Sequence, residues 1–256
     1  MCLLQSSPVF RRLIAGIVMF GIAFNAVANP EGMSVTSGSA TAWQNGAQLT
    51  VTASQNAFIN WQSFNIAPGE TTTFQQPSAA SIVWNRINDP NPSQIWGHLN
   101  ANGVVVLMNQ SGFFFGPGSV VNAAGFVATT ATMLPESGIG GIWQFNGPPP
   151  VASIVNYGEV KVNSGGSIFL IAEKIENHGV LMSPDGTLGL YAGKEVWMSE
   201  RPDGRGVSMR VNLPNGSVDN YGKLVADGGT IALNAQVVNQ NGIIQGRFCA
   251  ESKWRH

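Results

Sequence analysis

The sequence predicts an all-β protein, a single-stranded parallel β-helix with an irregular N-terminal cap. Three observations predict this fold class. Only 11% of the residues are charged, whereas 31 of the 256 residues are glycine. Apolar residues in the second half alternate with a period of two, which is typical of strands and not of helices. The same half contains a repeat of about 20 residues, the length of one coil in a stacked β-helix.

The charge content excludes some classes of partner. The 13 Lys and Arg residues nearly balance the 14 Asp and Glu residues, which gives a formal net charge of −1. No cluster of basic residues occurs, and phosphate binding needs clustered Lys and Arg, so we expect no nucleic acid partner. A chain with so few charges must solvate its surface with hydroxyl and amide groups, which favours a long β surface.

Three segments of the second half align as repeats, at 166–172, 186–192 and 229–235. The step from the second to the third segment is roughly two periods long, and it contains a polar excursion at 199–206. A unit of this length cannot bury its apolar face alone, but stacked coils can do so. A β-sandwich with chance internal similarity is the alternative. The alignment places six apolar residues in two columns, with Ile168, Leu188 and Ile231 in one and Leu170, Leu190 and Leu233 in the other.

A second set of positions marks the corners of the coils. The segments 156–158, 177–179 and 220–222 each begin with Asn and end with Gly, and Asn241 is followed by Gly242. Asn and Gly are the residues that most readily adopt positive φ, so we expect the chain to turn at these positions.

The first half is less regular and richer in aromatic residues. Strands are expected at Gln48–Ala53, which alternates, and at Val104–Met108, which is continuously apolar. The unpaired ends of a β-helix would template aggregation, so an atypical cap is expected at the N-terminus. We therefore divide the mature chain into residues 29–145, the cap and first coils, and residues 146–246, the regular coils.

The N-terminal segment 1–28 has the order of features found in a secretory signal peptide. Two arginines at 11–12 precede an uncharged apolar run at 13–24, and small residues follow. Cleavage is expected between Ala28 and Asn29. The alternative is a membrane anchor, but the run is shorter than the about 20 residues needed to span a bilayer. The sequence therefore predicts a protein that is secreted or displayed at the cell surface after passage through the periplasm.

Three stretches resemble the two-partner secretion (TPS) domain at the N-terminus of filamentous haemagglutinin-type exoproteins, also called the haemagglutination activity domain. They are NAFINWQSFNI at 56–66, QPSAASIVWNRI at 76–87 and IWGHLNANGVVVLMNQSGFFFG at 95–116. Their order and spacing make the resemblance specific, and it extends over residues 29–246.

The resemblance implies a right-handed parallel β-helix with an N-terminal cap and a function in export. The Sec machinery delivers such a chain to the periplasm. An outer-membrane β-barrel transporter of the Omp85 (TpsB) type then binds the extended chain through periplasmic POTRA domains. The chain crosses the pore and folds outside the cell. The resemblance implies no catalytic residue, no cofactor and no metal.

The family also has an Asn-Pro-Asn-Gly-Ile motif, which we interpret as the transporter-recognition motif. Here Gln, Ser and Phe replace the Pro, the second Asn and the Ile, although Asn, Ser and Gly still suit a turn. A second family motif, Asn-Pro-Asn-Leu, has no clear counterpart, but 89–92 could form a similar turn. The positions that match the first motif are Asn109, Gln110, Ser111, Gly112 and Phe113.

Two other classes of function are alternatives to secretion targeting. Full-length relatives are often adhesins, so one alternative is a module that binds a carbohydrate or a host-cell surface. The other is a polysaccharide-degrading β-helix enzyme, which needs clustered carboxylates. Here Asp219 and Asp227 lie near repeat glycines, where a role in turns is expected, and His98 and His178 are each single. We therefore expect no enzymatic activity.

Residues 247–256 abandon the repeat and combine charges with Cys249 and Trp254 without a period. This change indicates a truncated or frameshifted reading frame, and a short natural tail is the alternative. In either case we expect an irregular tail.

Overall fold

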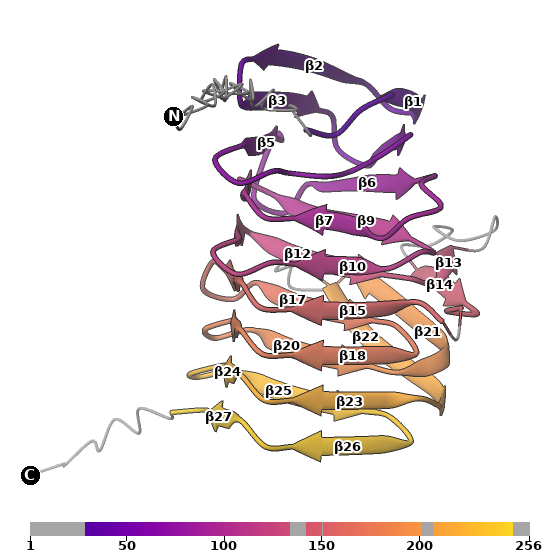
Figure 1. Ribbon diagram of the computed structural model, residues 1–256, viewed down its shortest axis with the longest axis vertical. Coiled ribbons are helices and arrows are strands. Elements are labelled where there is room, and N and C mark those ends of the chain that lie inside the picture. The colour runs from indigo at the N-terminus through magenta and orange to yellow at the C-terminus, as the bar shows by residue number, and fades with distance from the viewer. Residues whose placement is uncertain (1–28, 134–141, 150, 201–206, 248–256) are drawn as a thin grey trace, which may run out of the picture.

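The computed structural model describes residues 29–133, 142–149, 151–200 and 207–247. The predicted signal peptide therefore lies outside the described residues, as does nearly all of the predicted tail. Within those ranges the secondary structure consists of strands, which stack in one tall column (Figure 1). No helix in this part of the chain is long and apolar enough to cross a membrane.

Three long sheets form the faces of the column, and the chain visits them in turn as it winds. Face A contains β1 (Ser34–Ser37), β4 (Ala57–Trp61), β6 (Ile82–Ile87), β9 (Val104–Asn109), β12 (Gly125–Thr129), β17 (Ser167–Ile171), β20 (Thr187–Tyr191) and β25 (Thr230–Asn234). Face B contains β7 (Ser93–Ile95), β10 (Phe113–Phe115), β15 (Ser153–Asn156), β18 (Lys174–Asn177), β23 (Ser217–Asn220) and β26 (Val237–Gln240). Face C contains β2 (Ala40–Asn45), β3 (Gln48–Ala53), β5 (Thr71–Gln75), β8 (His98–Ala101), β11 (Val120–Ala123), β16 (Glu159–Val162), β19 (Val180–Met182), β24 (Lys223–Val225) and β27 (Ile243–Gln245).

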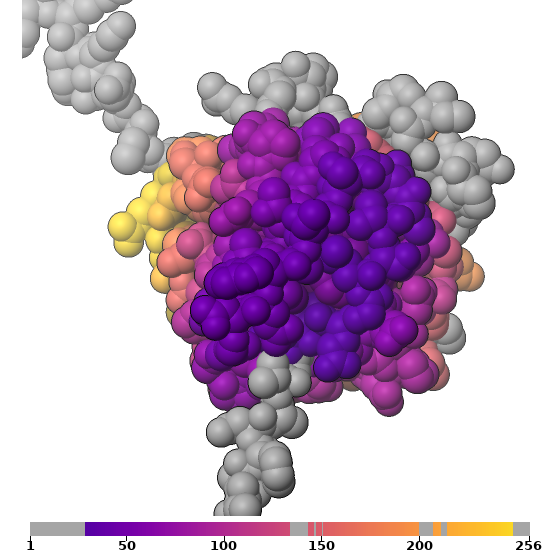
Figure 2. Space-filling model, turned by 90° about the horizontal axis from the view of Figure 1, so that it is seen from above, coloured from indigo at the N-terminus to yellow at the C-terminus, as the bar shows by residue number. Residues whose placement is uncertain are grey.

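Antiparallel strands cap the N-terminal end of the column. β1 runs antiparallel to β4, and β2 runs antiparallel to β3. From β3 and β4 onward, the described strands of the three faces pair in parallel with strands one coil away. Figure 2 looks onto this end, where the indigo N-terminal residues cover the coils beneath. The predicted fold class, an all-β parallel β-helix, is confirmed.

The interior of the column is built from apolar residues that recur at the same position in successive coils. The register of β17, β20 and β25 aligns two such columns, Ile168 with Leu188 and Ile231, and Leu170 with Leu190 and Leu233. The members on β17 and β20 are fully buried, whereas those on β25, the last described strand of face A, are half-buried. Burying a large aliphatic side chain contributes about 1.5–3 kcal/mol, so each enclosed coil stabilises the stack.

The corner glycines are required by close packing between coils and not by positive φ, which corrects the expectation from the sequence. A Cβ on Gly179 would lie 2.0 Å from the carbonyl oxygen of Gly158, and one on Gly222 would lie 2.1 Å from that of Gly179. Positive φ occurs elsewhere in the coil, for example at Asp185 with a φ of 54°. The glycine column therefore allows successive corners to approach to the strand spacing of about 4.8 Å.

Two excursions from the corner between faces A and B form a fourth, antiparallel sheet. The sheet contains β13 (Thr132–Met133), β14 (Ile142–Asn146), β21 (Gly193–Glu200) and β22 (Val207–Pro214). The sequence led us to expect only a polar excursion at 199–206. Instead, the long step in the repeat holds the paired strands β21 and β22, and residues 201–206 lie outside the described part of the chain.

The fourth sheet covers the outer surface of face A. Outward-facing side chains of face A, including Trp84 and Phe169, pack with Trp143, Val196 and Met198 in a second hydrophobic core. The ring centroids of Trp84 and Trp143 are 4.9 Å apart. Without the fourth sheet, face A would expose a large apolar patch to water, which soluble proteins avoid. The strands of these excursions therefore contribute side chains to the folded core.

Replacing Gly179 by alanine is expected to destabilise the fold, because the new Cβ would collide with the backbone of the preceding coil. We expect the free energy of unfolding to fall by about 1–3 kcal/mol, the usual cost of overpacking. Gly246→Ala is the matched control, since its Cβ would have its nearest neighbour at 3.7 Å. Urea unfolding measures both variants, and equal stabilities would contradict the close-packing argument.

Candidate functional site: the recognition turn and a surface groove

The five residues of the predicted recognition motif form the corner between β9 and β10. Asn109 ends β9 and is 1% exposed. Its Oδ1 atom accepts a hydrogen bond from the N–H of Ser111 at 2.9 Å. Its Nδ2 atom donates to the carbonyl of Asn91 at 3.2 Å and to the hydroxyl of Ser93 at 3.0 Å. Asn109 therefore closes its own turn and fastens this turn to the coil before it.

Two further motif residues are also buried. Gly112 adopts a φ of 109°, and a Cβ at this position would lie 2.6 Å from the carbonyl oxygen of Ser153. The turn thus needs glycine both for its backbone conformation and for the approach of the next coil. Phe113 is 1% exposed and stacks on Phe115 inside the column. The family's aliphatic residue is replaced here by a larger side chain that still fills the interior.

Ser111 and Gln110 lie nearer the surface. Ser111 is half-buried, and its hydroxyl donates to the carbonyl of Asp89 at 2.8 Å. Asp89 begins the turn at 89–92, so the two turns are stacked one coil apart. Gln110 is exposed, and its side-chain amide donates to the hydroxyl of Thr132. Of the five motif residues, only Gln110 has its side chain fully on the surface.

A chain of buried side-chain amides runs along the corner between faces B and C. Asn156 donates to Asn177 at 2.8 Å, and Asn177 donates to Asn220 at 2.7 Å. Asn220 then donates to the side-chain oxygen of Gln240 at 2.9 Å. The Oδ1 atom of Asn156 also accepts from the N–H of Gly158, which sets the orientation of the first amide. Each buried amide thus finds its partner in the neighbouring coil.

A column of stacked rings stands on the surface beside the amides. The ring centroids of Tyr157 and His178 are 4.5 Å apart, and those of His178 and Tyr221 are 4.8 Å apart, with nearly parallel planes. Phe114 and Trp96 extend this aromatic column toward the N-terminus. The column was not predicted from the sequence. The sequence feature that could have predicted it is the aromatic residue between Asn and Gly in each of the three corner segments.

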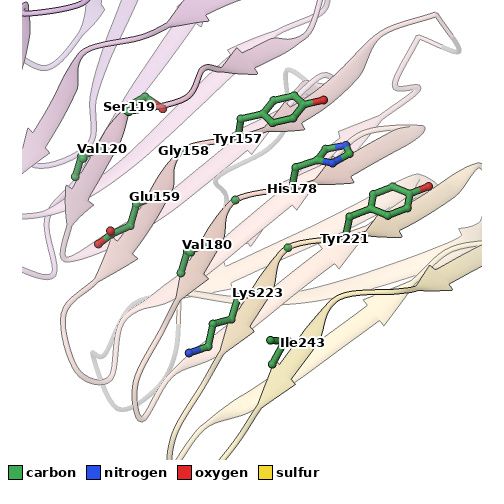
Figure 3. Close-up of a pocket in the computed structure, with 13 residues that line it drawn as sticks. Ser119, Val120, Tyr157, Gly158, Glu159, His178, Val180, Tyr221, Lys223 and Ile243 are labelled. Carbon is green, nitrogen blue, oxygen red and sulfur yellow. The ribbon is translucent and has the colours of Figure 1, made fainter.

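A groove of about 540 Å³ runs along the same corner (Figure 3). Glycines form its floor, the aromatic column forms one wall, and the first residues of the face C strands form the other. The floor is Gly158, Gly179 and Gly222, the aromatic wall is Tyr157, His178 and Tyr221, and the opposite wall is Val120, Glu159, Val180, Lys223 and Ile243.

An ion pair on face B lies next to the aromatic column. The Nζ atom of Lys174 is 2.7 Å from the carboxylate of Glu176. The hydrogen bond from Lys174 lowers the pKa of Glu176, and the same bond raises the pKa of Lys174. The second carboxylate oxygen of Glu176 lies 3.4 Å from Nε2 of His178. Such pairs at the surface contribute at most about 1 kcal/mol, so this pair adds little to the stability of the fold.

Three of the four residues considered as catalytic candidates, His178, Asp219 and Asp227, make structural contacts. His98 is exposed on β8, and His178 lies within the aromatic column. Asp219 was expected in a turn, but it lies within β23, where its carboxylate accepts from the side chain of Asn239 at 2.6 Å. Asp227 does lie in a turn, after β24. In the described ranges, no group of His, Cys, Asp and Glu side chains could hold a metal ion.

Comparison with known proteins assigns this arrangement to a family. A family model described as "TPS secretion domain" matches residues 26–248. This chain belongs to the TPS secretion domain family. The match includes the cap, the turn at 109–113 and the described coils, so the family and the secretion-domain function predicted from the sequence are confirmed.

Proteins of Haemophilus influenzae are similar to this TPS domain. A heme/hemopexin-binding protein of strain Rd is 31% identical over 219 residues, which cover 82% of this chain and 24% of that protein. Another heme/hemopexin-binding protein is 42% identical over 77 residues, which cover 30% of this chain and 8% of that protein. The crystal structure of the HMW1 secretion domain matches with a TM-score of 0.75 and 31% identity, and covers 83% of this chain and 57% of that chain.

The TPS domain described here therefore spans about a quarter of the length of the first of these relatives. None of the three matched proteins is named as an enzyme. TPS exoproteins are secreted or surface-associated, which agrees with the destination predicted for this chain.

Replacing Asn109 by alanine is expected to destabilise the folded TPS domain. The variant leaves the fully buried hydroxyl of Ser93 and the half-buried N–H of Ser111 without their partner, and an unsatisfied buried group costs about 1–3 kcal/mol. The matched control is Gln110→Ala, because among the described residues the exposed side chain of Gln110 bonds only to exposed Thr132, and we expect a loss of about 0.5 kcal/mol or less. Urea unfolding followed by tryptophan fluorescence measures both, and equal losses would refute the role assigned to Asn109.

Proposed function

We propose that this chain is the secretion-targeting domain of a larger exoprotein and that an Omp85 (TpsB)-type outer-membrane transporter recognises it before it folds. In this proposal, the Sec machinery exports the chain and the signal peptide 1–28 is removed between Ala28 and Asn29. The POTRA domains of the transporter then bind the extended chain in the periplasm. The β-helix forms outside the cell, after the chain has crossed the pore.

The burial of the recognition turn is the observation that carries this proposal. Asn109 and Phe113 are each 1% exposed, and Gly112 is also buried. A transporter that reads these residues must therefore bind them before β9 and β10 take their places in the column. An extended segment also offers free backbone N–H and C=O groups, which can add a strand to a sheet edge of the partner. The motif would serve recognition first and folding afterwards.

Folding outside the cell gives transport a direction in this proposal. Each coil pairs with the coil before it, so coils can close one after another from the cap. Each large apolar side chain that is enclosed contributes about 1.5–3 kcal/mol. A closed coil is too wide to return through a pore that passes an extended chain. Crossing of the outer membrane would then need no nucleotide hydrolysis.

The contacts of Asn29 support the proposed cleavage site. Asn29 is 2% exposed, and its Oδ1 atom accepts a hydrogen bond from the hydroxyl of Thr72 at 3.2 Å. Close by, Glu31 forms an antiparallel bridge with Ser63. Asn29 and Glu31 thus belong to the folded cap, and cleavage after Ala28 would leave these contacts intact.

Gln110→Ala is expected to lower export several-fold while leaving the folded domain stable. Gln110 contributes little to the fold, but it occupies the second position of the motif in the extended chain. Thr132→Ala is the matched control, because it removes the same side-chain hydrogen bond without changing the motif. The measurement is the secreted fraction in a Gram-negative host that produces the transporter. If Gln110→Ala is exported as well as the unchanged chain, recognition does not use this motif.

Leu170→Asp tests whether the closing of coils drives export. Leu170 is fully buried, and a carboxylate in its place would prevent this coil from closing. We expect the secreted fraction to fall and the chain to accumulate in the periplasm. Asn163→Asp introduces the same group at an exposed position before the same strand and should be exported normally. Undiminished export of Leu170→Asp would exclude coil closure as the driving force.

A module that binds a carbohydrate or a host-cell surface is the second candidate function, and the corner groove favours it. Secretion targeting uses the extended chain, so it assigns no role to a groove that exists only after folding (Figure 3). The groove is walled by tyrosines and crosses several coils, which is a suitable surface for an elongated ligand.

A further inference from the structure

We propose that the corner groove binds a neutral, linear oligosaccharide that lies along the long axis of the column. The proposal deepens the second candidate function and rests on it. The groove crosses successive coils, which are about 4.8 Å apart. This spacing is close to the length of one sugar ring in an extended chain, so successive rings could meet equivalent positions of successive coils. Repeat proteins commonly use such elongated surfaces for binding.

The floor of the groove argues against a peptide ligand. The carbonyl of Gly158 accepts from Val180, that of Gly179 accepts from Lys223, and that of Gly222 accepts from Ile243, at 2.8 to 2.9 Å. The N–H groups of Gly179 and Gly222 donate to carbonyls of the preceding coil. Backbone groups of the floor are therefore already paired, and a peptide could not add there as a further strand. Recognition must come from the side chains of the walls.

The charges of the walls argue against a polyanion. Glu159 and Lys223 stand on the same wall, and their charges cancel (Figure 3). Glu159 is also 3.8 Å from Lys161, in a pair whose side chains are about half exposed. Polyanions such as nucleic acids and sulfated sugars need clustered cations, and this groove offers none. A ligand without net charge therefore fits the groove best.

The aromatic wall supplies the contacts that a sugar requires. Tyr157 is 42% exposed and Tyr221 is 50% exposed, and within the described residues neither phenol hydroxyl has a hydrogen-bond partner. Because the rings stack on one another, each tyrosine presents the edge of its ring and its hydroxyl, a donor and acceptor that matches the hydroxyls of a sugar ring. Stacking on His178 holds both rings in place before binding. Less side-chain entropy is then lost when a ligand binds.

The test is isothermal titration of the purified full chain, refolded in vitro, with cellohexaose, chitohexaose and maltohexaose. A heparin hexasaccharide serves as the anionic probe. We expect at least one neutral hexasaccharide to bind and Tyr221→Ala to weaken its binding by about tenfold or more. Val180→Arg should have a similar effect, because it fills the groove while leaving the aromatic column intact. The control is Trp43→Ala, whose ring is 63% exposed on β2, outside the groove.

Several results would overturn the proposal. These are the absence of binding by all three neutral sugars, binding by the heparin probe alone, and unchanged binding by the folded Val180→Arg variant. If Tyr221→Ala does not refold, sugar binding by Tyr221→Phe and Val180→Arg tests the proposal instead. Neither of these substitutions removes a side chain that packs against its neighbours. Refolding in vitro makes the experiment independent of the transporter. A failure of sugar binding therefore leaves the secretion proposal untouched, and a failure of export leaves the groove untouched.

Discussion

Successive coils pair through backbone hydrogen bonds in a fixed register, and the rest of the structure depends on this pairing. The register places inward-facing residues beside residues of the same kind in the next coil, at a spacing of about 4.8 Å. Leu170 faces Leu190, the amide of Asn156 meets that of Asn177, and glycines meet at the corners. Apolar columns fill the interior, and the side chains of the amide column hydrogen-bond to one another. The glycine columns let successive corners approach closely. A change at one position therefore disturbs at least two coils.

The same register makes burial depend on neighbours on both sides. Leu188 lies between two coils and is fully buried, whereas Ile231 in the last described strand of its face is half-buried and Ile244, in register with buried Leu224, is 48% exposed. A coil is thus stable only after the coil before it has formed, and it is completed by the coil after it. The antiparallel cap supplies the first template, since β3 and β4 would otherwise present open edges. Folding from the cap follows from this dependence.

The apolar columns and the corners could be predicted from the sequence, because the register repeats them in successive coils. The fourth sheet could not, since Phe145 pairs with Val196 across two coils and neither position recurs. The corner glycines were identified from the sequence, but the close packing that requires them was not. The carbonyl oxygen with which a Cβ would collide belongs to the preceding coil. The position of Asn109 came from the family resemblance, whereas its burial depends on Asn91, also one coil away. In these three cases, what escaped prediction is the particular residue of another coil that makes the contact.

The turn at 109–113, the proposed recognition motif, connects this register to the proposed export. Asn109 uses both ends of its amide inside the folded column, and Phe113 lies among interior rings. Neither side chain can contact a transporter and complete the column at the same time. If the transporter holds the extended motif, closure of the coil between β7 and β10 must release it. The free energy gained by that coil then opposes the free energy of binding, so recognition can be strong enough to select the chain without retaining it.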